Sequence, residues 1–358
     1  MGKKPTEEQI KRLPKVLLHD HLDGGLRPQT IIDIAKEIGY EELPSYDATE
    51  LAKWVAESCN SGSLVRYLEA FAHTVAVMQR REDIVRVARE CALDLARDGV
   101  VYAEVRGAPE LLTKKGLSLE AVVQATIEGY RLGETDAKAE GFNIRVESLL
   151  CGMRHDVNSQ ASAELAVKYS GKGVVGFDIA GPEDGFPPTN QLDSFKYLQS
   201  HNCHYTIHAG EAAGLESIKA AVEICGAQRI GHGVRITEDI SNGSVGPTAT
   251  IVRDKKIALE MCPSSNIQTG AAKSLAAHPI DELEKLGFAV TINTDNRLMS
   301  GTSMSKEVSL IVETFGWDFE KLERATITAM NSAFISESER GEIIEKIIKP
   351  GYAKISAE

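Results

Sequence analysis

The sequence predicts an α/β protein built as a closed (β/α)8 TIM barrel, with a helical insertion after the first strand and further helices at its C-terminal end. Two observations support this prediction. Eight short apolar runs alternate with longer amphipathic stretches along the 358 residues. Such alternation of strands and helices is typical of parallel sheets. No Gly-x-Gly-x-x-Gly turn follows the first run, so an open dinucleotide-binding sheet is not favoured.

The expected strands follow one another at regular intervals. In chain order they are residues 16–18, 100–105, 144–150, 174–179, 205–207, 229–230, 257–261 and 289–292. Helical patterns lie between most of them, for example at 83–97, 119–140 and 216–225. Residues 319–349 predict closing helices. We find no linker that divides the chain, so residues 1–358 are expected to form a single barrel domain.

Residues 28–98 form a long insertion between the first and second strands, and their pattern is mostly helical. Two interpretations stay open at this point. The insertion can be ordinary helix packing on the outside of the barrel, or part of it can cover the barrel mouth, where ligands bind in this architecture.

Composition excludes several classes of function. Lys plus Arg number 40 against 52 Asp plus Glu, and the formal net charge is -12. Nucleic acid and anionic membranes are therefore not expected as partners, because both need a basic surface. The sequence contains no apolar run long enough to span a bilayer and no signal-peptide pattern at its start. The six cysteines form no C-x-x-C pair, which indicates reduced, buried thiols in a cytoplasmic protein. No feature indicates an oligomeric state.

Polar side chains gather where the expected strands end. The four segments are His19-Asp20-His21-Leu22-Asp23-Gly24, His208-Ala209-Gly210-Glu211, Gly231-His232-Gly233 and Asn293-Thr294-Asp295-Asn296. The C-terminal ends of barrel strands meet at one mouth. We therefore expect these side chains, which are far apart in the sequence, to lie close together.

A metal site is predicted among them. His19 and His21 are two residues apart, so both side chains point to the same side of a strand, into the barrel. His208 adds a third imidazole and Asp295 a carboxylate. Imidazole suits zinc, and also iron, nickel or copper. Three histidines and one aspartate leave a position for water, which is typical of a catalytic site, and bound zinc lowers the pKa of such a water to about 7.

Glu211 and His232 each allow a structural and a functional interpretation. An acidic residue such as Glu211 commonly favours a helix N-terminus, whereas beside an activated water it would supply a proton. An isolated histidine is usually structural, but Gly231 and Gly233 let the backbone of His232 come close and leave its ring facing the site. Asp20 points to the opposite face of its strand, and the sequence suggests no role for it.

These motifs in this order resemble the adenosine deaminase family of the amidohydrolase superfamily. The resemblance runs from about residue 14 to about residue 335. Further segments that agree with the family are residues 14–16, 101–106, 150–155, 176–181 and 262–266. The family implies hydrolytic deamination of adenosine and 2′-deoxyadenosine to inosine and 2′-deoxyinosine, with release of ammonia, as part of purine salvage.

The resemblance also implies residue roles. One zinc ion, Zn2+, is expected on His19, His21, His208 and Asp295. Water then attacks C6 of a purine nucleoside while Glu211 protonates N1. His232, with Asp295, is expected to orient and deprotonate the water and to stabilise the developing oxyanion. On the substrate side, the expected residues are His21, Asp23 at the ribose 5′-hydroxyl, the backbone N–H of Gly181 at N3, and Asn296 at N7.

Two positions depart from the family pattern. Asn296 stands where a second aspartate is usual; N7 only accepts hydrogen bonds, so an amide donor is compatible with it. Gly107 stands where an aromatic residue is common, and we expect it to change the pocket shape locally. The expected fourth strand ends without a lysine that could bridge two metals, which favours one metal ion. The P-C-x-x-C signature of cytidine-type deaminases is absent.

Alternatives remain open for the substrate. A related aminopurine, such as adenine, a modified adenosine or aminofutalosine, would use the same chemistry. AMP is disfavoured because Arg27 alone is a weak phosphate site near Asp23. The alternative from another class is a barrel that binds a nucleoside without turning it over, although such a protein would be expected to lack Glu211 or a metal ligand.

Overall fold

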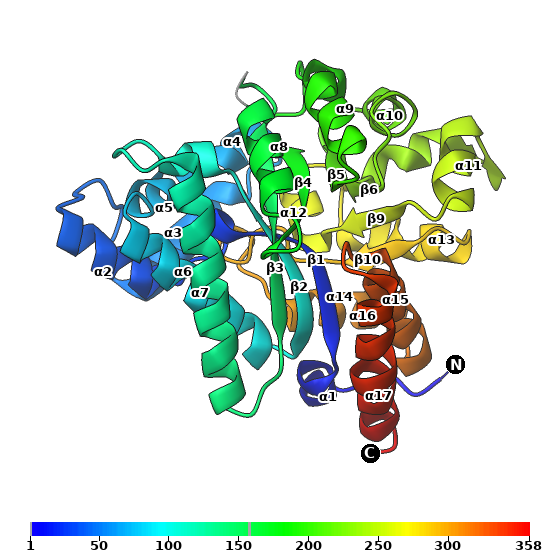
Figure 1. The fold of residues 1–358 in the computed structure, drawn as a ribbon. Coiled ribbons are helices and arrows are strands. Elements are labelled where there is room, and N and C mark those ends of the chain that lie inside the picture. Colours follow the sequence, from blue (N-terminus) through cyan, green and yellow to red (C-terminus); the bar gives the residue numbers. More distant parts are fainter. Residues whose placement is uncertain (1, 157–158) are drawn as a thin grey trace.

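The computed structural model describes residues 2–156 and 159–358. Its centre is an eight-stranded parallel sheet in the order β1-β2-β3-β4-β5-β6-β9-β10 (Figure 1). The strands are β1 (Lys15–His21), β2 (Val100–Gly107), β3 (Arg145–Met153), β4 (Val174–Ala180), β5 (His204–Ala209), β6 (Arg229–His232), β9 (Ala258–Met261) and β10 (Val290–Ile292). Each of the eight predicted strands is present, within a few residues of its predicted bounds.

The sheet closes on itself between β10 and β1. The backbone N–H of His21 donates to the carbonyl of Asp295 at 2.7 Å, and the N–H of Asp295 donates to the carbonyl of His19 at 2.9 Å. Below them, Asn293 Oδ1 accepts hydrogen bonds from the N–H groups of Leu18 and His19. The predicted TIM barrel is therefore confirmed, and its closing seam lies beside three of the predicted metal ligands.

The insertion after β1 is helical, as predicted. It contains α2 (Pro28–Ile38), α3 (Ala48–Cys59), α4 (Leu64–Glu69), α5 (Phe71–Val77) and α6 (Arg81–Arg97). The last of them, α6, packs along α7 (Leu119–Ala139) in the outer ring. The other four helices lie together beside the barrel, at the blue end of the chain in Figure 1.

The remaining helices lie around the barrel (Figure 1). They are α1 (Glu7–Arg12), α8 (Ser159–Lys168), α9 (Leu192–Ser200), α10 (Leu215–Lys219), α11 (Pro247–Asp254), α12 (Pro263–Gln268), α13 (Ile280–Lys285), α14 (Met304–Phe315), α15 (Phe319–Ser332), α16 (Glu337–Ile343) and α17 (Lys349–Ser356). Two details differ from the prediction. The helix expected at 216–225 begins as α10 and continues as a π-helix at Ala220–Ile224, and a small hairpin, β7 (Ile240–Ser241) with β8 (Ser244–Val245), follows β6.

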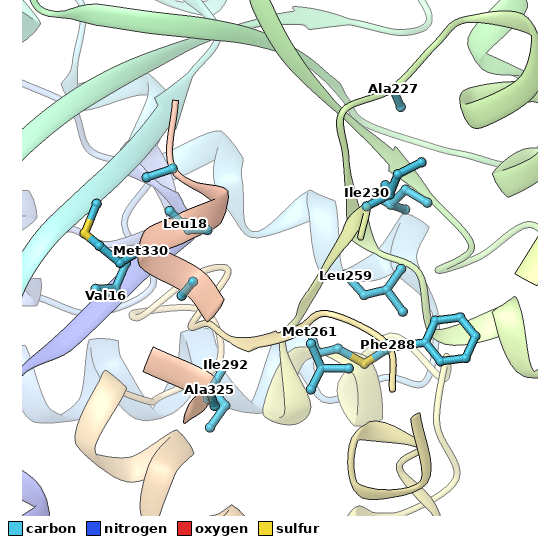
Figure 2. Close-up of a cluster of buried hydrophobic side chains, with 14 of the residues drawn as sticks. Val16, Leu18, Ala227, Ile230, Leu259, Met261, Phe288, Ile292, Ala325 and Met330 are labelled. Atoms are coloured by element: carbon cyan, nitrogen blue, oxygen red, sulfur yellow. The ribbon is translucent and has the colours of Figure 1, made fainter. Parts of the chain in front are cut away.

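Apolar packing fixes the C-terminal helices to the barrel. Helix α15 contacts β1, β9 and β10. Figure 2 shows this part of the core, where aliphatic side chains of these strands and of β6 gather with Ala325 and Met330 of α15. Full burial of a Leu, Ile or Met side chain contributes about 1.5–3 kcal/mol. This apolar packing thus stabilises the strands whose C-terminal ends carry the polar residues.

The six cysteines are all buried and unpaired, as predicted. Burial raises the pKa of Cys262 well above its ordinary value, and its thiol donates to the carbonyl of Glu260. Among the helices of the described chain, none is long and apolar enough to cross a membrane.

Candidate active site

Four side chains from three strand ends converge at the barrel mouth. One ligand atom from each of His19, His21, His208 and Asp295 lies within 4.8 Å of the others. His19 Nε2 is 3.2 Å and His21 Nε2 is 3.4 Å from Asp295 Oδ1, and the Nε2 atoms of His21 and His208 are 3.3 Å apart. These separations are those expected between ligand atoms that each lie about 2.0–2.2 Å from one metal ion.

The outer ring nitrogens show which atoms face the metal site. His19 Nδ1 lies 3.0 Å from Glu260 Oε2, and His208 Nδ1 lies 2.8 Å from Asp178 Oδ2. A carboxylate only accepts, so both Nδ1 atoms carry the proton and both Nε2 atoms present lone pairs. Buried His19 Nε2 accordingly finds no hydrogen-bond donor and faces another acceptor, Asp295 Oδ1. Converging acceptors of this kind fit a cation.

Burial favours the forms that bind a metal. It lowers the pKa of His208, and it lowers that of His21 well below the ordinary value, so both rings stay neutral. Burial opposes ionisation of Asp295, yet the neighbouring rings of His19 and His232 hold its pKa well below the usual range. Burial and Arg106 lower the pKa of His19, but its contacts with Asp295 and Glu260 raise it overall, so a metal bound at Nε2 would take the place of a proton. Neutral imidazoles and an ionised carboxylate are the set that zinc binds.

Two arginines hold the supporting carboxylates in place inside the barrel. Arg106 contacts both Asp178 and Glu260, and Arg229 contacts Glu260 and Glu104. All five side chains are at most 2% exposed. The barrel interior therefore contains an ion-pair network. The group of His19, His21, His208 and Asp295 lies at the end of this network that is nearest the barrel mouth.

Glu211 lies at the same mouth and is set up as an acid. Burial, followed by the charges of Asp295 and Glu183, raises its pKa well above the ordinary value. Its loop is tied down by Glu183, whose carboxylate accepts from the N–H groups of residues 210–213 and from the hydroxyl of Ser217. The surroundings of Glu211 thus favour its protonated form, and Glu183 braces the turn that carries it.

His232 lies opposite Glu211, and its Nε2 is 3.5 Å from Glu211 Oε2. The backbone of His232 has φ = 63° and that of Asp295 has φ = 59°, both in the left-handed region that most residues avoid. Such strain persists only where surrounding contacts enforce it. Ser265, whose hydroxyl donates to Asp295 Oδ2 at 2.6 Å, is one of those contacts.

A cavity of about 360 Å3 opens beside these groups. It is lined by every residue predicted to act on the substrate: His21, Asp23, Gly181, Glu211, His232, Asp295 and Asn296. Gly181 has φ = 101°, which favours glycine, and an added Cβ would lie 3.1 Å from Met153. A Cβ on Gly24 would lie 1.9 Å from Asn296 Oδ1, so this glycine makes room for the amide.

The insertion supplies one wall of the cavity. Leu64, Tyr67 and Leu68 of α4 line it, together with Phe71 and Val75 of α5. The Tyr67 hydroxyl is buried and lies 2.9 Å from the Ser300 hydroxyl, beyond β10. Helices of the insertion therefore border the cavity at the barrel mouth.

Three other residues raised by the sequence have clear positions. Asp20 is buried, accepts from Thr294 and pairs with Arg297, so it supports the closing seam. Arg27 is paired with Asp94 at 2.6 Å and does not line the cavity. Gly107 borders a separate small cavity of about 20 Å3 that it shares with Asp23.

The sequence prediction missed the supporting residues Asp178, Glu183, Glu260, Ser265 and Asn266. A signal existed for Asp178 and Glu260, since each is a charged residue inside an otherwise apolar strand. Ser265 and Asn266 lie within a segment that agrees with the family pattern. Glu183 had no signal, because its contacts with the turn after β5 are set only by the fold.

A parallel barrel that carries a histidine–aspartate group able to hold a metal ion, with a buried acid beside it at the C-terminal ends of the strands, has the architecture of a metal-dependent hydrolase. Comparison with known proteins narrows the class. The adenosine deaminase family model matches residues 14–350. The chain therefore belongs to the adenosine deaminase family.

Individual relatives are similar over nearly the whole chain. Adenosine deaminase 1 of Streptomyces coelicolor is 57% identical over 363 residues, covering 100% of this chain and 92% of its own. Adenosine deaminase of Mycolicibacterium vanbaalenii is 57% identical over 353 residues, covering 97% and 98%. Among solved structures, an Arabidopsis N6-mAMP deaminase matches with a TM-score of 0.83 at 25% identity, covering 96% of this chain and 99% of its own.

Proposed function

We propose that the chain catalyses hydrolytic deamination of adenosine and 2′-deoxyadenosine to inosine and 2′-deoxyinosine, and that it uses one zinc ion per chain. The observation that carries the proposal is the pairing of Glu211, a buried acid, with the four-ligand group in one cavity of nucleoside size. The curated relatives at 57% identity, named adenosine deaminases, support the choice of substrate.

The zinc ion would be held by His19, His21, His208 and Asp295, and when bound it makes a water nucleophilic at neutral pH. Glu211 gives its proton to N1 of the purine, which makes C6 electrophilic. His232 and Asp295 orient the attacking water and stabilise the charge that develops on its oxygen. One of these two accepts the proton of the water.

The proton balance closes within the site. As the C6–O bond forms, the C6–N1 π electrons move to N1, which takes the proton of Glu211. The proton removed from water passes to the exocyclic amine, the C6–N bond breaks and ammonia leaves. The remaining hydroxyl proton restores the acid form of Glu211, and C6 becomes a carbonyl.

The other cavity residues position the nucleoside. We assign Asp23 to the ribose 5′-hydroxyl, the backbone N–H of Gly181 to N3 and an N–H of Asn296 to N7. His21 lies between the metal group and the substrate side. Because Arg27 is already paired with Asp94, no arginine of the first β–α loop is available for a 5′-phosphate, which favours a nucleoside over AMP.

We also propose that residues 1–358 form one domain in which the insertion acts as a lid. Its support is the wall that α4 and α5 contribute to the cavity.

A substrate panel tests the function. Adenosine, 2′-deoxyadenosine, adenine, AMP and N6-methyl-AMP are offered to the purified protein, with absorbance and ammonia (or methylamine for N6-methyl-AMP) followed and metal content measured on the same sample. We expect turnover of the two nucleosides with about one zinc per chain. Turnover of only another aminopurine would contradict the substrate assignment, and no turnover with zinc bound would contradict the enzymatic proposal.

A variant tests the acid. Glu211→Gln should retain zinc and lose the proton donor, with kcat lower by roughly 10²–10⁴-fold. Glu216→Gln, an exposed change on the same segment, is the matched control and should retain activity. Loss of zinc from Glu211→Gln would show that Glu211 is part of the metal site instead.

A further inference from the structure

The ring of His232 is held from behind by a buried amide. Asn266 Nδ2 lies 3.0 Å from His232 Nδ1, and the two residues are at most 1% exposed. The nitrogen and oxygen of an amide have nearly the same shape, so their identity must follow from their partners. The proton of His232 can be placed once the two amide atoms of Asn266 are identified.

Two independent donors identify the oxygen of Asn266. The backbone N–H of Cys262, which can only donate, points to Asn266 Oδ1 at 3.2 Å. His278 Nε2 also lies 3.1 Å from this oxygen. His278 Nδ1 accepts from the backbone N–H of Ile280 at 3.3 Å, so the proton of the neutral His278 ring is on Nε2 and donates to Asn266.

The other end of the amide therefore donates. Asn266 Nδ2–H points to His232 Nδ1, which must accept and so carries no proton. The neutral His232 ring then has its proton on Nε2. This atom faces Glu211 and belongs to the cluster of Glu211, His232 and Asp295 at the cavity.

We propose that Asn266, supported by His278, is a positioning residue that fixes His232 as the Nε2–H tautomer. His232 is then the hydrogen-bond donor to the attacking water and Asp295 the acceptor of its proton, two roles that the proposed function did not divide between them. The donor role rests on the proposed deamination, whereas the tautomer does not.

The tautomer can be measured without activity. In 15N-histidine-labelled protein, both zinc-loaded and metal-free, His232 should show a protonated Nε2 and an unprotonated, hydrogen-bonded Nδ1. The nine histidines make a small set of signals, and His232→Asn identifies the relevant one. A protonated Nδ1 in the wild-type protein would overturn the proposal.

Two substitutions separate positioning from packing. Asn266→Asp keeps the shape but places an acceptor against His232 Nδ1, so the proton should move to Nδ1 and Nε2 should become an acceptor. Asn266→Ala removes the contact and imposes neither tautomer. If His232 acts as a donor, kcat should fall about 10²–10³-fold in Asn266→Asp, as for loss of one transition-state donor, and less in Asn266→Ala, with KM within a few-fold.

A purely structural role predicts the reverse order. The cavity left by alanine would then cost more activity and more thermal stability than the isosteric aspartate, and this result would overturn the proposal. If the wild-type protein deaminates none of the panel substrates but shows the Nε2–H tautomer, the proposed function fails and the tautomer assignment stands.

Discussion

Replacing Asp178 by asparagine should weaken metal binding without touching a metal ligand. The carboxylate of Asp178 receives only donors: Arg106 and His208 Nδ1 on one oxygen, and the backbone N–H groups of Ile179 and His208 on the other. Whichever way the asparagine amide is turned, its NH2 group faces donors. In either orientation His208 loses the carboxylate charge that increases its basicity, and with NH2 at the Oδ2 position it also loses the acceptor that fixes its ring, whereas Arg106 keeps Glu260 and the carbonyl of Leu18.

Loss of such an outer partner typically costs 10–100-fold in metal affinity, which is about 1.4–2.7 kcal/mol. The assay is competition for zinc between the metal-free protein and a chromophoric chelator. At saturating zinc, kcat of Asp178→Asn should stay within roughly ten-fold of wild type, because ligands and acid remain.

The control is Asp281→Asn. Asp281 also receives several donors, from Trp317, Lys321 and Lys285, but it lies on α13 outside the cavity. It should lower thermal stability and leave zinc affinity unchanged. The reasoning is refuted if Asp178→Asn binds zinc as tightly as wild type, or if Asp281→Asn weakens zinc binding equally.

Three further changes have defined outcomes. Burial opposes ionisation of Asp281, but hydrogen bonds from Lys285, Lys321 and Trp317 lower its pKa to about 2. The stability that ionised Asp281 contributes is therefore complete above about pH 4 and lost toward pH 2. The Tm difference between wild type and Asp281→Asn should shrink over this range, and a constant difference would contradict the prediction. Tyr67→Phe removes the hydrogen bond with Ser300, which contributes about 0.5–1.5 kcal/mol. KM for adenosine should therefore rise roughly 2–10-fold with kcat little changed. An unchanged KM would argue against a lid that is held by this contact. Asn296→Ala removes the amide donor at N7, so kcat/KM for adenosine should fall roughly ten-fold while that for 7-deazaadenosine changes far less. Equal losses for the two substrates would show that Asn296 does not contact N7.

The fold was predictable because the strands of a barrel are short apolar runs with polar residues at their C-terminal ends. The run at 174–179 corresponds to β4. The polar residues His19, His208 and Asp295 converge because the C-terminal ends of all strands in a closed parallel barrel lie at the same mouth. The i, i+2 spacing of His19 and His21 predicted two rings on one side, and both rings lie in the ligand group. The roles of these residues stay predictions.

Other features depend on contacts between distant segments. Glu183 lies in a loop without periodicity, and only the fold brings it to the turn of residues 210–213. The orientation of His232 depends on Asn266 and His278, whose relation follows from hydrogen-bond direction and not from spacing. The hairpin of β7 and β8 has two residues per strand, too few to produce an alternating pattern.

The buried charges of the barrel give an independent reason to expect a divalent cation. The connected network holds four carboxylates, those of Glu104, Asp178, Glu260 and Asp295, against the two guanidinium groups of Arg106 and Arg229. With the histidine rings neutral, two negative charges are left without a counter-charge in an interior where an unpaired ion costs several kcal/mol. An ion of charge +2 bound between neutral imidazoles at Asp295 makes the network neutral. The same count predicts that a monovalent cation would not replace it, and that replacing Arg106 by an uncharged residue would disturb the metal group although Arg106 is not a ligand.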